Sequence, residues 1–258
     1  EQMSGVAIVN QLILVYNLAI FGAVSAASIF GAQYFGNGDH RGHMHSFRFK
    51  LYATLLVSGL TMLLLLTKGS DLISLYLTDT AGNGATDVAL QYGKQYLVIM
   101  LVGLVPFAVN QAYATNIKET GQTLVPMLAS FVAVGTNAVL DYLLIFGVGP
   151  FPKLGVTGAA LATVIARYVE AVIVVFWAHR NREKNRYLEG AYRGFGIPVS
   201  ELKTILIKGL PLMFNEVLWA AGMTTVTQCY SVRGLDVVAG LNIATTITNL
   251  FNIVYIQL

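Results

Sequence analysis

Charged residues are scarce in this chain, and their scarcity excludes an ordinary soluble domain. Asp, Glu, Lys and Arg make up 11% of the 258 residues, whereas hydrophobic residues make up 55%. Soluble domains carry about 25% charged residues. The mean hydropathy of +0.64 is typical of a chain that lies largely in lipid. We therefore predict a multi-pass protein of the plasma (inner) membrane.

Cysteine is almost absent: the sequence contains only Cys229. One thiol can form neither a disulfide framework nor a cysteine metal site. The sequence also lacks a nucleophile elbow, a phosphate-binding loop and a zinc-helix motif, so we predict no enzyme, no cofactor and no metal site. His40, His43 and His45 lie close together but have no cysteine or carboxylate neighbours, so we interpret them as solvated loop residues.

Apolar stretches of roughly 17–25 residues are needed to cross a bilayer as helices. Seven stretches qualify, at residues 6–30, 51–67, 96–113, 124–146, 157–178, 206–230 and 237–258. Strands of a membrane barrel would be about half as long and would alternate in polarity. The predicted fold class is therefore an all-α polytopic membrane protein.

Basic residues gather in alternate loops between these spans. The first, third and fifth loops contain Arg41, Arg48, Lys50, Lys118, Arg180, Arg182, Lys184, Arg186, Arg193 and Lys203. The positive-inside rule places these loops in the cytoplasm. We interpret the cluster at 180–186 as a topology signal in contact with membrane lipid headgroups, and we expect no nucleic-acid binding.

The N-terminus then lies outside the cell, yet the chain has no initiator methionine and no signal peptide. An odd number of preceding helices would restore a cytoplasmic start. We therefore expect a fragment of a larger transporter, truncated at both ends.

The longest polar stretch divides the spans into groups of five and two. We predict an N-terminal lobe at 1–178, a cytoplasmic interlobe linker at 179–203 and the start of a C-terminal lobe at 204–258. An offset of 235 residues aligns the first span with the last and places Asn17 on Asn252. This match supports parallel six-helix repeats.

Polar residues in the fourth and fifth spans suggest an ion site. Asn137 and Asp141 are four residues apart and so share a helix face. Thr163 falls at a similar depth on the next span, which runs in the opposite direction. Together they offer carboxylate, amide and hydroxyl oxygens, which suit a proton or Na⁺. The alternative is that Asp141 extends to the membrane surface and Asn137 only ties helices together.

Further ionisable residues lie inside the predicted spans. Glu216 is about 15 Å deep by helix rise, so it is protonated, bound to an ion or paired. A functional cation site and a protonated structural glutamate are both open. Arg167 and Glu170, three residues apart, are interpreted as a pair that neutralises itself.

A substrate path is suggested by polar and aromatic residues. Asn242 and Asn249 follow a helical stripe that could line a water-filled path, although helix packing explains them equally well. Tyr142 and Trp219 are candidate cation-π surfaces for a substrate, with ordinary packing as the alternative.

Four motifs occur together along the chain: GAQYFGNGD (31–39), NAVLDYLLIFG (137–147), LGVTGAALAT (154–163) and GLPLMFNEVLWAAG (209–222). In this order and spacing they resemble the MATE family of multidrug and toxin extrusion transporters. The resemblance covers essentially the whole chain. It implies helices two to eight of twelve, with two lobes joined at the basic linker.

The resemblance also implies a function and a site. It implies an antiporter, expected to be monomeric, that exports organic cations or drugs against an inward Na⁺ or H⁺ gradient. Asn137, Asp141 and Thr163 match the N-lobe cation site of the family, and Glu216 matches an acid associated with the C-lobe cation site. The family's first-helix aspartate, which completes the N-lobe site, is not in this sequence.

Two other functions fit parts of the pattern. A flippase for lipid-linked oligosaccharides from the same superfamily would be expected to have a more cationic cavity. A seven-helix receptor or photoreceptor would share the seven spans and the external N-terminus, but the last span has no lysine for a retinal Schiff base.

Overall fold

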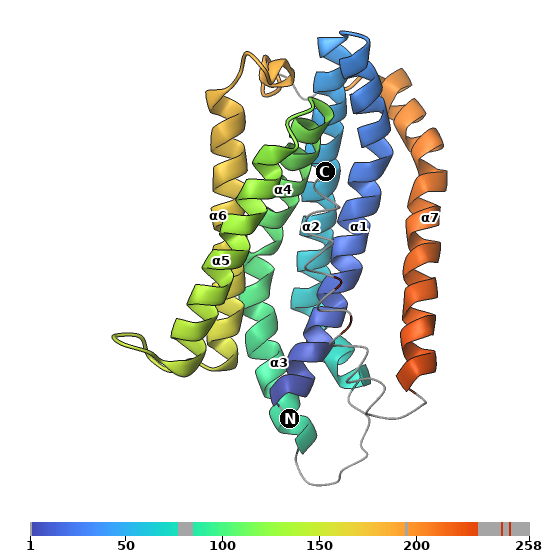
Figure 1. Cartoon of the computed structure of the whole chain (residues 1–258). Helices are drawn as coiled ribbons and strands as arrows, with labels where there is room; N and C mark the ends of the chain where they lie inside the picture. The colour runs from blue at the N-terminus through green and yellow to red at the C-terminus, as the bar shows by residue number, and fades with distance from the viewer. Residues whose placement is uncertain (1, 77–84, 194–195, 232–243, 245–247, 249–258) are drawn as a thin grey trace.

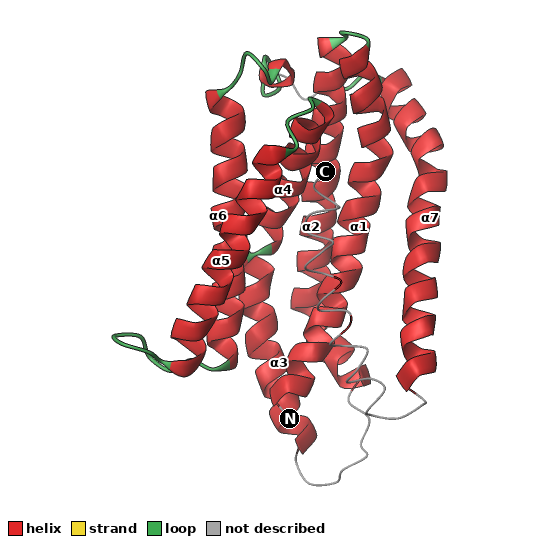
Figure 2. Ribbon diagram, in the orientation of Figure 1, coloured by secondary structure: helices red, strands yellow, loops and turns green. Residues whose placement is uncertain are grey.

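The chain forms a bundle of long helices (Figures 1 and 2). The computed structural model describes residues 2–76, 85–193, 196–231, 244 and 248, and only part of the side chains of the last helix. The elements are α1 (Gln2–Gly36), α2 (His40–Tyr76), α3 (Ala85–Val102), α4 (Leu104–Glu119), α5 (Leu124–Phe146), α6 (Val156–Arg180), the short 3₁₀ helix η1 (Arg186–Leu188) and α7 (Val199–Ser231). Within these ranges there is no strand, so the predicted all-α class is confirmed.

Four of these helices are long and apolar enough to cross a membrane, or five if the bent pair of α3 and α4 counts as one span. They correspond to the first five predicted spans, and α5 has the predicted bounds. α7 covers the sixth predicted span. Apart from residues 244 and 248, the seventh predicted span at 237–258 lies outside the described residues, and so does the aligned Asn252.

The third predicted span is broken. α3 and α4 meet at Gly103 with a bend of 42°. Pro106 lacks a backbone N–H, so the carbonyl of Val102 has no partner in the helical ladder. That carbonyl accepts a hydrogen bond from the Tyr168 hydroxyl of α6 at 3.5 Å. The break is therefore stabilised by the neighbouring helix.

The helices are arranged with α7 at one edge beside α1, and with α5 and α6 together at the opposite edge (Figure 1). The turn at 37–39, the turn at 120–123 and the segments at 181–193 and 196–198 lie at the same end of the bundle, the upper end in Figure 1. The loop at 147–155 lies at the other end. This alternation agrees with the predicted distribution of basic loops.

The first predicted loop is largely helical, because α2 begins at His40 rather than at residue 51. Asp39 caps the helix: its Oδ1 accepts hydrogen bonds from the backbone N–H groups of Arg41 at 3.1 Å and Gly42 at 3.0 Å. Arg48 and Lys50 therefore lie on a helix, and they are buried, with exposed fractions of 7% and 0%. Their placement in a loop was wrong.

The interpretation of the histidines as solvated was wrong for His43 and His45, whereas His40 is exposed. His43 is 1% exposed, and its Nε2 lies 3.2 Å from a carboxylate oxygen of Glu119 in α4. His45 Nδ1 lies 2.8 Å from Glu201 at the start of α7. The carboxylate partners are far away in the sequence, so local spacing could not reveal them.

The predicted linker packs onto the bundle. α6 continues to Arg180 and α7 begins at Val199, so the connection is shorter than predicted. Tyr187 of η1 is buried, and its ring centroid lies 5.0 Å from those of Phe47 and His43. These ring contacts anchor the connection to α2.

Candidate cation-binding site

The site is built on a helical hairpin of α5 and α6. Gly147 ends α5 in a left-handed conformation, with φ of 72°, as helix ends commonly require. The backbone N–H of Leu154 then donates to the carbonyl of Leu144 at 2.9 Å. Gly158 allows close contact between the two helices, since a Cβ there would lie 2.7 Å from the same carbonyl oxygen. This approach fixes the register of α5 against α6.

The hairpin brings together all three residues of the predicted N-lobe site. In the orientation that satisfies both neighbours, the Asn137 side-chain nitrogen donates to Asp141 Oδ2 at 3.3 Å, and its oxygen accepts from the backbone N–H of Thr163 at 3.2 Å. The amide orientation is assigned from these hydrogen bonds. In the opposite orientation the nitrogen faces Thr163 Oγ1 at 3.5 Å. The predicted juxtaposition of these residues is found.

Asp141 keeps one oxygen open. Its Oδ1 is buried and has no hydrogen-bond partner among the residues that the structure describes. The other carboxylate oxygen, Oδ2, accepts the hydrogen bond from Asn137 of the same helix. The Thr163 hydroxyl donates to the Ala159 carbonyl at 3.0 Å, so its oxygen can still accept a hydrogen bond or coordinate a cation. Asp141 and its neighbours can therefore take up a proton or a small cation.

The other predicted site residues are not placed beside Asp141 by described contacts. The backbone of Glu216 belongs to α7, but its side chain lies outside the part that the structure describes. Asn242 and Asn249 also lie outside the described residues. Tyr142 of α5 and Trp219 of α7 are each 59% exposed. Tyr142 packs against Phe146, with ring centroids 5.8 Å apart.

The structure adds Tyr96 of α3 to the surroundings of the site. Its hydroxyl donates to Asn10 Oδ1 at 3.2 Å, and it lies within electrostatic range of Asp141 and Arg167. Sequence reasoning missed both Tyr96 and Asn10. Each is a single polar residue in an apolar span, and only the packing of α3 against α1 brings Tyr96 and Asn10 together.

Arg167 and Glu170 take separate partners, which corrects their interpretation as a pair. Arg167 donates to the Gly103 carbonyl at 3.3 Å, and its guanidinium carbon lies 5.1 Å from the ring centroid of Phe107. Glu170 accepts a hydrogen bond of 2.6 Å from Ser130 of α5. Their charges remain within electrostatic range, but each residue ties α6 to a different helix.

Known proteins resemble this chain in sequence and in fold. The profile of the MatE family matches residues 1–143. A protein of Thermotoga maritima named "Probable multidrug resistance protein NorM" is 26% identical over 252 residues, which are 97% of this chain and 52% of that protein. The chain spans about half the length of the curated relatives it matches.

Solved structures show the same fold. An outward-facing multidrug resistance MATE family transporter has a TM-score of 0.75 and 22% identity, and the match covers 98% of this chain and 55% of that one. An inward-facing structure has a TM-score of 0.68 and 22% identity, with coverage of 83% and 46%. The receptor alternative was therefore wrong.

The MatE family profile covers more than half of the chain, and the helix bundle has the fold of solved MATE family transporters. Several of its helices are long and apolar enough to cross a membrane. Members of the MatE family are transporters and not enzymes, in agreement with the prediction from the sequence. The chain therefore belongs to the MatE family of multi-pass membrane transporters.

Proposed function

We propose that the protein is a cation-coupled antiporter that exports organic cations or drugs in exchange for Na⁺ or H⁺. The observation that carries this proposal is the cluster of Asn137, Asp141 and Thr163, in which Asp141 retains an open carboxylate oxygen. Membership of the family and the names of the relatives support multidrug export.

The coupling follows from the cost of charge in the membrane. A carboxylate costs on the order of 2.5–3.5 kcal/mol at the hydrocarbon centre and less toward the surface, and uptake of a proton or Na⁺ removes the net charge. Asp141 lies five residues before the end of α5, so this cost is an upper bound for it. Asp141 Oδ1, Thr163 Oγ1 and, in one amide orientation, Asn137 Oδ1 are the hard oxygen ligands available. A cationic substrate then competes with the coupling ion for the charge of Asp141 or for the conformation that the charge favours.

Such competition can drive transport only if the two conformations bind the ion with different affinities. Inward-facing and outward-facing structures exist for transporters of this fold, which supports alternating access. The α5–α6 hairpin carries the whole cluster. A movement of the hairpin relative to α3 would therefore change the electrostatic interaction between Asp141 and Tyr96. Glu216, Trp219, Tyr142, Asn242 and Asn249 remain proposed contacts for the second cation or the small-molecule substrate.

Transport by the full-length protein in proteoliposomes tests this function. Uptake of a fluorescent organic cation is measured under an imposed Na⁺ gradient and under an imposed H⁺ gradient, for wild type and for Asp141→Asn. Asp71→Asn is the control, because Asp71 is an exposed aspartate paired with Lys68 at 3.5 Å. We expect one gradient to drive uptake and Asp141→Asn alone to abolish the coupling.

If neither gradient moves any cationic substrate, the antiporter proposal is overturned, and flipping of a lipid-linked oligosaccharide becomes the function to assay. Glu216→Gln in the same assay separates the contribution of α7 from that of the hairpin. Loss of coupling in Glu216→Gln but not in Asp141→Asn would contradict the central role of Asp141.

A further inference from the structure

An apolar groove runs along the surface between α4 and α6. Its volume is about 560 Å³. Its walls include Val105 and Val109 of α4 and Val172, Val175 and Phe176 of α6. Val172 and Phe176 are 63% and 70% exposed. The groove is therefore open to the medium around the bundle and is suited to a hydrocarbon chain.

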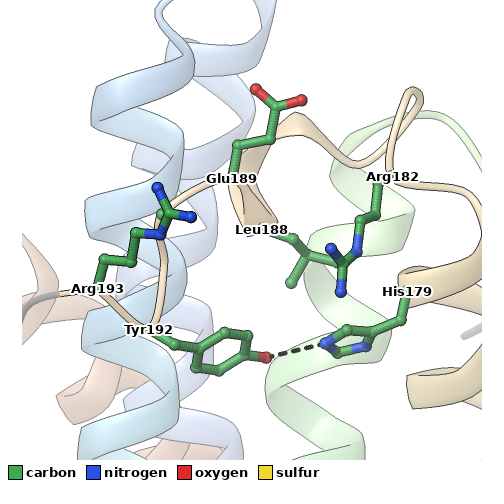
Figure 3. Close-up of a pocket in the computed structure, with 7 residues that line it drawn as sticks. His179, Arg182, Leu188, Glu189, Tyr192 and Arg193 are labelled. Atoms are coloured by element: carbon green, nitrogen blue, oxygen red, sulfur yellow. Dashed lines mark hydrogen bonds between the residues drawn. The ribbon is translucent and has the colours of Figure 1, made fainter.

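A second cavity, of about 390 Å³, lies at the end of α6 where the connection to α7 turns back (Figure 3). Arg182 and Arg193 line it, together with His179 and Tyr192. The Tyr192 hydroxyl lies 3.5 Å from His179 Nε2, and Tyr192 also hydrogen-bonds Tyr113. His179 Nδ1 lies 2.9 Å from the carbonyl of Val175, to which it donates. These contacts hold one wall of the cavity in place.

His179 lines both the groove and the cavity, so the two lie next to each other at the end of α6. The groove follows α6 from Tyr168 to His179, which at 1.5 Å per residue is roughly 16 Å. The hydrocarbon core of a bilayer is about 30 Å thick, so this length is close to the depth of one leaflet. An acyl chain in the groove would have its headgroup at the cavity.

The charges at the cavity favour an anion. The side chains of Arg182 and Arg193 form no ion pair or hydrogen bond with any residue that the structure describes. Guanidinium groups bind phosphate oxygens in a bidentate manner. Glu189 also lines the cavity, but its carboxylate projects away from the His179 and Tyr192 pair in Figure 3. Two arginines and one glutamate leave a net charge that suits a single phosphodiester.

We propose that the groove and the cavity together bind one anionic glycerophospholipid. Arg182 and Arg193 hold its phosphodiester, and the α4–α6 groove holds an acyl chain. The cavity lies at the end of the bundle whose basic loops are predicted to be cytoplasmic, where anionic lipids attract basic side chains. This site is separate from the Asp141 cluster, so the proposal does not depend on the coupling ion.

Native mass spectrometry of the full-length protein in detergent tests the proposal, with phosphatidylglycerol and phosphatidylcholine added in turn. We expect one phosphatidylglycerol to be retained in preference to phosphatidylcholine. The double variant Arg182→Gln/Arg193→Gln should bind it about thirtyfold more weakly, the expected loss for two arginines at a lipid surface. Arg41→Gln/Lys203→Gln is the matched control, because it removes two exposed charges from the same end outside the cavity.

The groove is tested by filling it. Val172→Trp should reduce lipid retention as the arginine variant does, whereas Val132→Trp, at an exposed apolar position of α5, should not. Inorganic phosphate should not displace the lipid, since the acyl chain contributes to binding. The proposal would be overturned if the two lipids were retained equally or if phosphate alone displaced the lipid. It would also be overturned if Arg182→Gln/Arg193→Gln or Val172→Trp bound phosphatidylglycerol as the wild type does.

Discussion

Lys50 of α2 and Glu119 of α4 form a buried ion pair, with side chains that are 0% and 5% exposed. His43 approaches the same carboxylate, and Gly31 of α1 leaves the space that the carboxylate occupies. Three helices therefore meet at one charge. A buried charge is tolerated only while its partner remains, so this contact is a sensitive point of the fold.

Lys50→Met should lower the free energy of unfolding by about 3–5 kcal/mol, because it removes the lysine partner of the buried Glu119 and leaves only His43 beside the carboxylate. Lys68→Met is the control, since the Lys68–Asp71 pair is 66% and 69% exposed. Its effect should stay below about 1 kcal/mol. Denaturation of the purified protein in detergent measures both. Equal stability of the two variants would show that the Lys50–Glu119 pair is not buried.

Gly158→Ala should disturb the cation site from a distance. A methyl group at this position would lie 2.7 Å from the Leu144 carbonyl oxygen, so α5 and α6 must separate. We expect a loss of about 1–3 kcal/mol in stability, together with weaker ion binding. Gly135→Ala in α5 meets no atom within 4 Å and should be neutral or stabilising by up to about 1 kcal/mol. Thermal denaturation with and without Na⁺ distinguishes them.

Arg48→Gln should release the connection between α6 and α7. Arg48 donates to the carbonyls of Gly190, Ala191 and Gly196 at 2.7, 2.8 and 2.9 Å. Loss of these charge-assisted hydrogen bonds should speed limited trypsin cleavage of the connection by about tenfold. Arg41→Gln, at an exposed residue of the same helix, should leave the cleavage rate unchanged. Similar rates in both variants would contradict the anchoring role of Arg48.

Alkaline pH should weaken the fold through Tyr192. Partial burial raises the pKa of Tyr192, whose side chain is 56% exposed, above its usual range, against the opposing effects of the Tyr113 hydrogen bond and Arg182. A raised folded-state pKa contributes stability that is complete below the unfolded pKa of about 10 and is lost as the pH rises through the folded pKa. Tyr192→Phe should flatten this decline, whereas Tyr142→Phe, on α5 beside Phe146 and outside the contact with Tyr113 and Arg182, should not. Denaturation curves between neutral and alkaline pH provide the measurement.

The helical spans could be predicted from the sequence because apolar length alone marks a membrane helix. The Asn137, Asp141 and Thr163 cluster could also be predicted, since i,i+4 spacing and helix rise fix positions within a short hairpin. The break at Gly103 was not predicted, although Pro106 removes one hydrogen bond of the helix there; the contact between Tyr168 and Val102, which stabilises the break, joins two helices far apart in the sequence.

The burial of Lys50 could not be predicted in this way. A lysine at the edge of an apolar run is typical of a loop, and its partner Glu119 lies more than sixty residues away in the sequence. The same holds for His45 and Glu201, which meet only because α7 packs beside α1 and its start lies near α2. Long-range ion pairs depend on tertiary packing, which local patterns do not specify.

Ion release on substrate binding is a direct test of coupling at Asp141. The purified full-length protein is saturated with the coupling ion in weak buffer, an organic cation is added, and released H⁺ or Na⁺ is measured for wild type, Asp141→Asn and Asp71→Asn. We expect release from wild type and Asp71→Asn and none from Asp141→Asn. Equal release from all three proteins would contradict a role for Asp141 in coupling.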